Sequence, residues 1–155
     1  MIETSAFQIA ERFIGIKETA GIMDNPMILA MLRLAADGDY DAWPEHDEVP
    51  WCSAFANYVC HLLRLPRSKS LRARSWLGVG RRISLDDARI GEDIVILWRG
   101  EAPQPGPEIV DAPGHVGFYA GHDDTYVQIL GGNQGDTVSV RSYRLERILG
   151  VRRLT

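Results

Sequence analysis

The sequence predicts an α+β fold in which N-terminal helices pack on an antiparallel β-sheet. Apolar residues recur at helical spacing in the first half of the chain. From Gly78 onward, short apolar runs alternate with turns rich in glycine and proline. Helices followed by hairpin-linked strands are typical of α+β proteins. No internal repeat or linker divides the chain, so residues 1–155 are expected to form one domain.

Helices are predicted over residues 4–16 and 25–38, between Pro50 and Pro66, and, as a short element, over 71–77. Ser5 and Gln8 have the spacing of a capping box. Asn25 is a good cap, and a proline such as Pro26 suits the first helical position.

Strands are predicted over 80–84, 93–98, 115–120, 125–130, 137–140 and 148–152. The 93–98 run is apolar at successive positions, which indicates a strand covered on both faces. Residues 101–114 contain four prolines and two glycines and are expected to form a surface loop.

Composition restricts the class of protein. The chain has 45% hydrophobic and 25% charged residues, a net charge of −4 and no basic stripe. We therefore expect a soluble, monomeric globular domain with neither nucleic acid nor membrane as partner. Residues 1–20 lack the pattern of a secretory signal peptide, so synthesis in the cytoplasm is expected.

Cys52 is the strongest candidate for chemistry. It follows Pro50-Trp51 at the predicted start of a helix, where free N–H groups and the helix dipole stabilise a thiolate. The alternative is that Cys52 is a small buried apolar residue. Cys60 lies eight residues further on, about 12 Å along a helix axis, which is too far for a disulfide. Two free thiols are expected, with Cys60 structural.

A nucleophilic cysteine needs a base and a group that orients the base. His115 opens a predicted strand beside a loop and is the best placed of the four histidines. Asn133 follows the returning strand and is predicted to orient the imidazole, with Gln128, Gln134 and Asp136 as the fallbacks. The alternatives are a structural histidine and an asparagine that serves only its turn.

Several short blocks together resemble the ordered blocks of the CHAP and NlpC-type cysteine peptidases, which are papain-like hydrolases of bacterial cell walls. The likeness is greatest to a small phage-associated group. The blocks are Gly15–Glu18 with Asn25-Pro26, Trp51–Asn57, Gly91–Val95, Gly114–Tyr119 and Gly131–Gln134.

The resemblance implies a papain-like fold, with Cys52, His115 and Asn133 cleaving amide bonds in peptidoglycan. An endolysin-like endopeptidase or N-acetylmuramoyl-L-alanine amidase is implied, which would reach the wall by release, injection or secretion. Many CHAP relatives have a glutamate near the place of Gly131 or Gly132, and this chain does not.

Trp51, Glu18 and Gln134 are predicted to contact the substrate. No cofactor is expected: the acidic loop Asp37–Glu48 lacks the spacing of a calcium loop and is better explained as a solvated surface. No histidine set has the spacing of a zinc site, so no metal is predicted.

The residues leave two other classes of function open. The same catalytic set would suit an acyl transferase or a protein-processing protease. A non-catalytic wall-binding or tail-associated module would keep the fold without the reaction.

Overall fold

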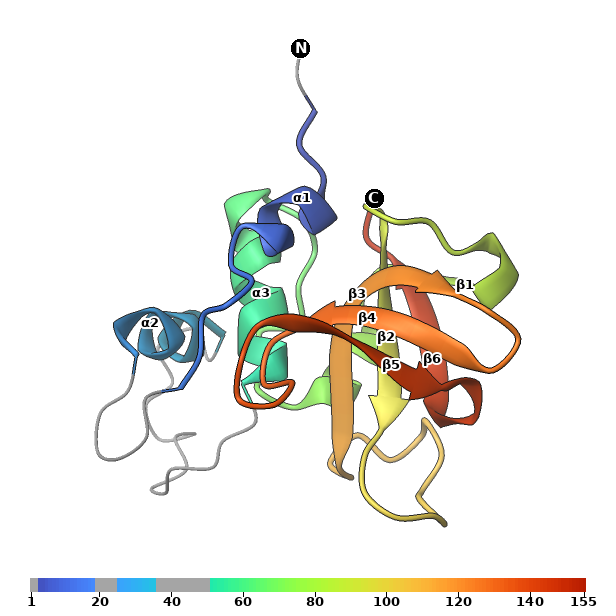
Figure 1. Cartoon of the computed structure of the whole chain (residues 1–155). Helices are drawn as coiled ribbons and strands as arrows, with labels where there is room; N and C mark the ends of the chain where they lie inside the picture. Colours follow the sequence, from blue (N-terminus) through green and yellow to red (C-terminus); the bar gives the residue numbers. More distant parts are fainter. Residues whose placement is uncertain (1–2, 19–24, 36–50) are drawn as a thin grey trace.

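The computed structural model describes residues 3–18, 25–35 and 51–155. Helices occupy one side of the molecule and a sheet the other (Figure 1). The helices are α1 (Ala6–Glu11), α2 (Pro26–Ala35) and α3 (Cys52–Leu62), with 3₁₀ turns η2 (Ala73–Gly78), η3 (Leu85–Asp87) and η4 (Leu145–Arg147). The strands are β1 (Arg81–Ile83), β2 (Asp93–Trp98), β3 (Gly114–His122), β4 (Tyr126–Gly131), β5 (Ser139–Arg144) and β6 (Ile148–Arg153).

The six strands form one antiparallel sheet in the order β1-β6-β2-β3-β4-β5. The α+β prediction is confirmed at this level. The central strand β2 pairs with β3 and β6, and its register sets Leu97 opposite His115.

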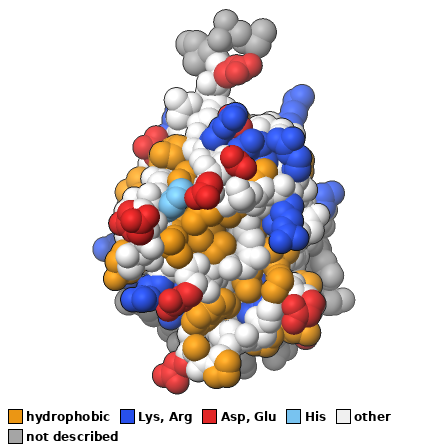
Figure 2. All heavy atoms as spheres, turned by 90° about the vertical axis from the view of Figure 1, so that its right-hand side faces the viewer, with side chains coloured by type: hydrophobic (Ala, Val, Ile, Leu, Met, Phe, Trp, Pro, Cys, Tyr) orange, Lys and Arg blue, Asp and Glu red, His pale blue; other side chains and the backbone are white. Residues whose placement is uncertain are grey.

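Both faces of β2 are covered, as the continuous apolar run predicts. Alternate side chains such as Ile94 and Ile96 join the core under the helices, together with Phe55 of α3. The intervening side chains such as Val95 and Leu97 join a second core on the other face. Seen from the side of β1 and β6, hydrophobic side chains gather in the middle of the surface with charged ones around them (Figure 2).

Helix α3 is fixed by polar contacts as well as by its apolar face. Ser53 Oγ donates to the Ser70 carbonyl at 2.6 Å and accepts from the Trp76 indole N–H at 2.9 Å. Asn57 accepts from the Lys69 backbone N–H at 2.9 Å. These buried groups tie the start of α3 to the chain that leads into the sheet.

Most predicted elements are present with shifted ends. The capping box of Ser5 and Gln8 is present, and Asn25 caps α2 by accepting from the Met27 N–H. The predicted strand 137–140 lies later, at β5, because Thr137 is held by Ile16 outside the sheet. Gly38 and the Asp37–Glu48 loop lie outside the described residues. Within the described ranges, no helix has the length and apolar character needed to span a membrane.

Candidate active site

Cys52 is the first residue of α3, as predicted, and the residue before it anchors the helix. Trp51 is 1% exposed, and its indole N–H donates to the Glu18 carboxylate. In this structure Trp51 is therefore a core anchor and Glu18 is its acceptor. Their predicted contact with substrate stays a prediction.

The Cys52 thiol is almost fully buried, at 1% exposure. Burial raises its pKa, because a thiolate would lose its hydration. Three influences oppose this: the backbone N–H of Val116, within hydrogen-bonding reach of the sulfur, the positive charge of Arg99, and the N–H groups at the helix start. The Val116 contact sets the sulfur against β3 next to His115.

His115 lies in β3, and its Nε2 is 2.8 Å from Gln134 Oε1. The amide of Gln134 has a fixed orientation, because its nitrogen donates to the carbonyls of Ile129 at 3.1 Å and Ser139 at 2.6 Å. Its oxygen also accepts from the Tyr143 hydroxyl at 3.0 Å. Gln134 Oε1 is thus an acceptor, so His115 Nε2 carries the hydrogen and Nδ1 has the free lone pair.

His115 Nδ1 is one of two buried side-chain nitrogens without a hydrogen-bond partner in the described part of the chain. The pKa of His115 is lowered to about 4, mainly by burial and in part by the charge of Arg99, whereas the bond to Gln134 opposes the shift. The imidazole is therefore neutral near pH 7. A free lone pair on a neutral ring is one requirement of a general base, and the other is a proton within hydrogen-bonding reach.

The contact expected from Asn133 is made by its neighbour Gln134 instead. Asn133 has a left-handed backbone with φ of 56° and is only half-buried, whereas Gln134 is 2% exposed. The turn around residue 133 directs the following side chain back under β4, to His115. The contact predicted for the orienting residue is thus made by Gln134, one of the fallbacks. The predicted contact of Gln134 with substrate stays a prediction.

Two glycines allow α3 and β4 to meet at this point. A Cβ on Gly132 would lie 2.7 Å from the Trp51 ring and 2.9 Å from Phe55 Cβ. A Cβ on Gly131 would lie 3.1 Å from Gln134 Oε1 and 3.4 Å from His115 Nε2. The absence of side chains at both positions makes room for the helix start and for the Gln134 amide.

The loop that leads to His115 is held by a buried arginine. Arg74 donates to the carbonyls of Pro113 at 3.1 Å, Pro105 at 2.9 Å and Gly106 at 2.7 Å. A Cβ on Gly114 would lie 2.9 Å from the Arg74 side chain. Arg74 thus fixes the backbone immediately before His115.

Sequence reasoning missed Tyr143 and Arg99. The Tyr143 ring lies 5.2 Å from the His115 ring, between centroids, and burial raises its pKa to about 12. Arg99 follows β2, where its backbone N–H donates to Pro113. Predicting that β2 pairs with β3 would have placed Arg99 next to the start of β3. Placing Tyr143 at the site required the full length of β5, which the sequence did not reveal.

The remaining histidines lie elsewhere or serve other contacts. His61 is exposed on α3, and His122 accepts from or donates to the Tyr119 hydroxyl at 2.6 Å. His46 lies outside the described residues. No group of three or more potential metal ligands occurs in the described ranges. The Asp37–Glu48 loop, where no calcium site was predicted, lies outside the described ranges.

Comparison with known proteins gives one structural neighbour to report. No protein-family model matches the chain, and no curated protein matches it. Among solved structures, NlpC1 from Trichomonas vaginalis aligns over 96% of this chain and 42% of its own, with 14% identity and a TM-score of 0.45. The chain thus spans less than half the length of that protein.

Proposed function

We propose that this chain is a papain-like cysteine hydrolase that cleaves amide bonds in bacterial peptidoglycan. The observations that carry the proposal are the free Nδ1 of His115, whose Nε2 is held by Gln134, and the Cys52 sulfur within reach of the backbone N–H of Val116, the next residue on β3. The resemblance of several sequence blocks to those of CHAP and NlpC-type peptidases suggests the substrate class. Cys52, His115 and Gln134 are the proposed catalytic set.

The reaction follows from the protonation states. As the Cys52 sulfur attacks the carbonyl carbon of the amide, Nδ1 of the neutral His115 takes the thiol proton. The imidazolium then returns the proton to the leaving amine, and water hydrolyses the thioester to release the acid and regenerate the thiol. The Cys52 backbone N–H at the start of α3 is a donor for the oxyanion. No metal or cofactor takes part.

The test is release of free amine from purified peptidoglycan. Cys52→Ala should abolish it, because no other thiol lies at the helix start, while Cys60→Ala, which removes the structural thiol, should retain it. Mass spectrometry of the fragments would identify the bond, whether in the stem peptide, the cross-bridge or the muramoyl amide. A folded Cys52→Ala protein that still releases amine would falsify the mechanism.

Burial of the thiol favours the non-catalytic wall-binding or tail-associated module as the second candidate. A thiol that is 1% exposed and has a raised pKa should be inert unless a ligand can reach it. Iodoacetamide near pH 7 separates the two functions: alkylation of Cys52 supports the hydrolase, and inertness supports the binding module. Transfer of the acyl group to an added amine in place of water would instead identify an acyl transferase.

The setting of this activity is also a proposal. The protein would be made in the cytoplasm and act as a monomer on the wall after release by lysis, injection by a tail or secretion. Peptidoglycan would be its partner, with no nucleic acid or membrane involved.

A further inference from the structure

Three arginines lie near Tyr143, whose ring is 5.2 Å from the His115 ring between centroids. We call Arg99, Arg141 and Arg147 the arginine rim. They come from the end of β2, from β5 and from η4. The charges of all three act on the Tyr143 hydroxyl, and that of Arg99 also acts on Cys52 and His115. Segments distant in the sequence therefore bring positive charge to one place.

The strand geometry explains why the rim lies on the His115 side. Leu97 is paired with His115, so their side chains share a face, and Arg99 is two residues beyond Leu97. Arg141 is likewise two residues before Tyr143 on β5. Arg147 stacks on the Trp98 ring, 4.4 Å from its centroid, and donates to the Gly100 carbonyl at 3.4 Å, so it contacts the residues on either side of Arg99 in the chain.

The rim has no counter-charge in the described part of the chain. The ion pairs there use Arg89, Arg144, Arg153 and His122, and none includes a rim arginine. The charged groups that act on Cys52, His115 and Tyr143 include no carboxylate from the described residues. Acidic residues outnumber basic ones by 21 to 17 in the whole chain, so this local excess of cations is not a reflection of composition.

We propose that the arginine rim binds a carboxylate of the substrate, so that the amide bond cleaved at Cys52 lies next to a free carboxylate. Guanidinium groups bind carboxylates through paired, charge-assisted hydrogen bonds, and Arg99 and Arg141 make no side-chain hydrogen bond within the described ranges. The inference rests on the proposed cleavage at Cys52 for the identity of the bond, but the anion site itself does not depend on the wall being the substrate.

The experiment compares iodoacetate with iodoacetamide as alkylating agents of Cys52. Iodoacetate carries a carboxylate where iodoacetamide carries a neutral carboxamide. Rates at Cys52 are followed by peptide mass mapping. The ratio of the iodoacetate rate to the iodoacetamide rate is compared with the same ratio for glutathione in the same buffer. The wild-type ratio should exceed the reference about tenfold, the effect of one charge-assisted contact, and should fall as salt is added.

Arg99→Gln should return the ratio to the reference value, and Arg141→Gln should lower it in part because that side chain is exposed. Arg81→Gln, on β1 at the opposite edge of the sheet from β5, is the matched control and should keep the wild-type ratio. A ratio at or below that of glutathione, or one unchanged in Arg99→Gln, would overturn the proposal. So would a Cys52 that neither reagent modifies, because no anion would then reach the site.

Peptidoglycan digestion gives the second readout. Converting its carboxylates to carboxamides should raise KM for the wild type about tenfold, and Arg99→Gln should remove the difference between the two substrates. If neither substrate is cleaved while iodoacetate is still preferred, the proposed function fails and the anion site stands. If both are cleaved equally by wild type, the anion site fails and the hydrolase stands.

Discussion

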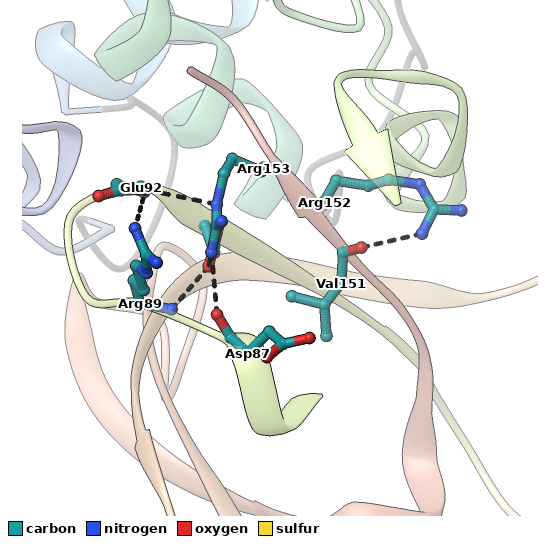
Figure 3. Close-up of polar contacts among 7 residues, drawn as sticks. Asp87, Arg89, Glu92, Val151, Arg152 and Arg153 are labelled. Carbon is teal, nitrogen blue, oxygen red and sulfur yellow. Dashed lines mark hydrogen bonds and ion pairs between the residues drawn. The ribbon is translucent and has the colours of Figure 1, made fainter. Parts of the chain in front are cut away.

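Two buried polar networks lie at different places in the sheet, and they are completed to different degrees. At the first, Arg153 of β6 donates to both carboxylate oxygens of Asp93, at 2.9 and 3.0 Å, and to the Asp87 carbonyl at 2.9 Å (Figure 3). Asp93 also accepts from the Arg89 backbone N–H at 2.6 Å, and Glu92 lies 3.3 Å from Arg153. Every charge there has a partner of opposite sign.

The second network, at His115, is incomplete. Gln134 satisfies one ring nitrogen and leaves the other without a partner, and the nearby arginines have no carboxylate within the described residues. Buried polar groups are almost always paired where they serve stability. The contrast fits the proposal that the His115 network serves a ligand and a reaction, whereas the Asp93–Arg153 network holds the sheet together.

The largest expected effect separates Gln134 from its neighbour. Gln134→Leu removes the acceptor that fixes the His115 tautomer, so amide hydrolysis should fall by at least about 100-fold. Asn133→Gly keeps the left-handed backbone and should leave the rate within about threefold of wild type. Rates on purified peptidoglycan, with circular dichroism to verify folding, make the measurement. A larger loss of rate in Asn133→Gly than in Gln134→Leu would restore Asn133 as the orienting residue.

Acid stability should report the incomplete network. The folded pKa of His115 is lowered from 6.5 to about 4, so between these values the unfolded chain binds a proton that the folded chain does not. This contribution to stability is present above pH 6.5 and is lost as the pH falls toward 4, by about 3 kcal/mol in total.

Denaturant unfolding across that pH range is the measurement. His115→Gln should remove this part of the loss, whereas His61→Gln, on the exposed side of α3, should retain it. A His115→Gln protein with the wild-type pH dependence would contradict the assignment.

Substitutions in the Asp93–Arg153 network should affect stability and leave activity unchanged. Asp93→Asn leaves Arg153 without its buried charge partner, and this should lower the thermal midpoint while the activity per folded molecule is unchanged. Glu92→Gln should lower it less, because the Glu92 side chain is 39% exposed and its pair with Arg153 is screened by water. Equal effects of the two substitutions would mean that burial does not distinguish the two carboxylates.

The sequence was informative wherever the signal was local. Pro50 and the apolar spacing after Cys52 predicted the helix start, and the short apolar run at 115–120 predicted the strand that bears His115. The continuous apolar run at 93–98 correctly predicted a strand buried on both faces.

What could not be predicted depends on side-chain direction and cross-strand neighbours. Asn133 and Gln134 are adjacent, and the side chain that reaches the imidazole is that of Gln134, which follows the positive φ at residue 133. Tyr143 reaches His115 because β5 continues beyond the predicted end at residue 140 and lies beside β4. Arg99 joins the site through the pairing of β2 with β3, which links residues 97 and 115.

The neutral amide that holds His115 has a consequence for the transfer of the proton to the leaving amine. A carboxylate at that place would stabilise the cationic ring and make it reluctant to release the proton it has gained. The Gln134 oxygen, already shared with the Tyr143 hydroxyl, offers no such charge. Once charged, the ring would be a strong donor, so departure of the amine should be fast relative to attack of the thiol on the amide.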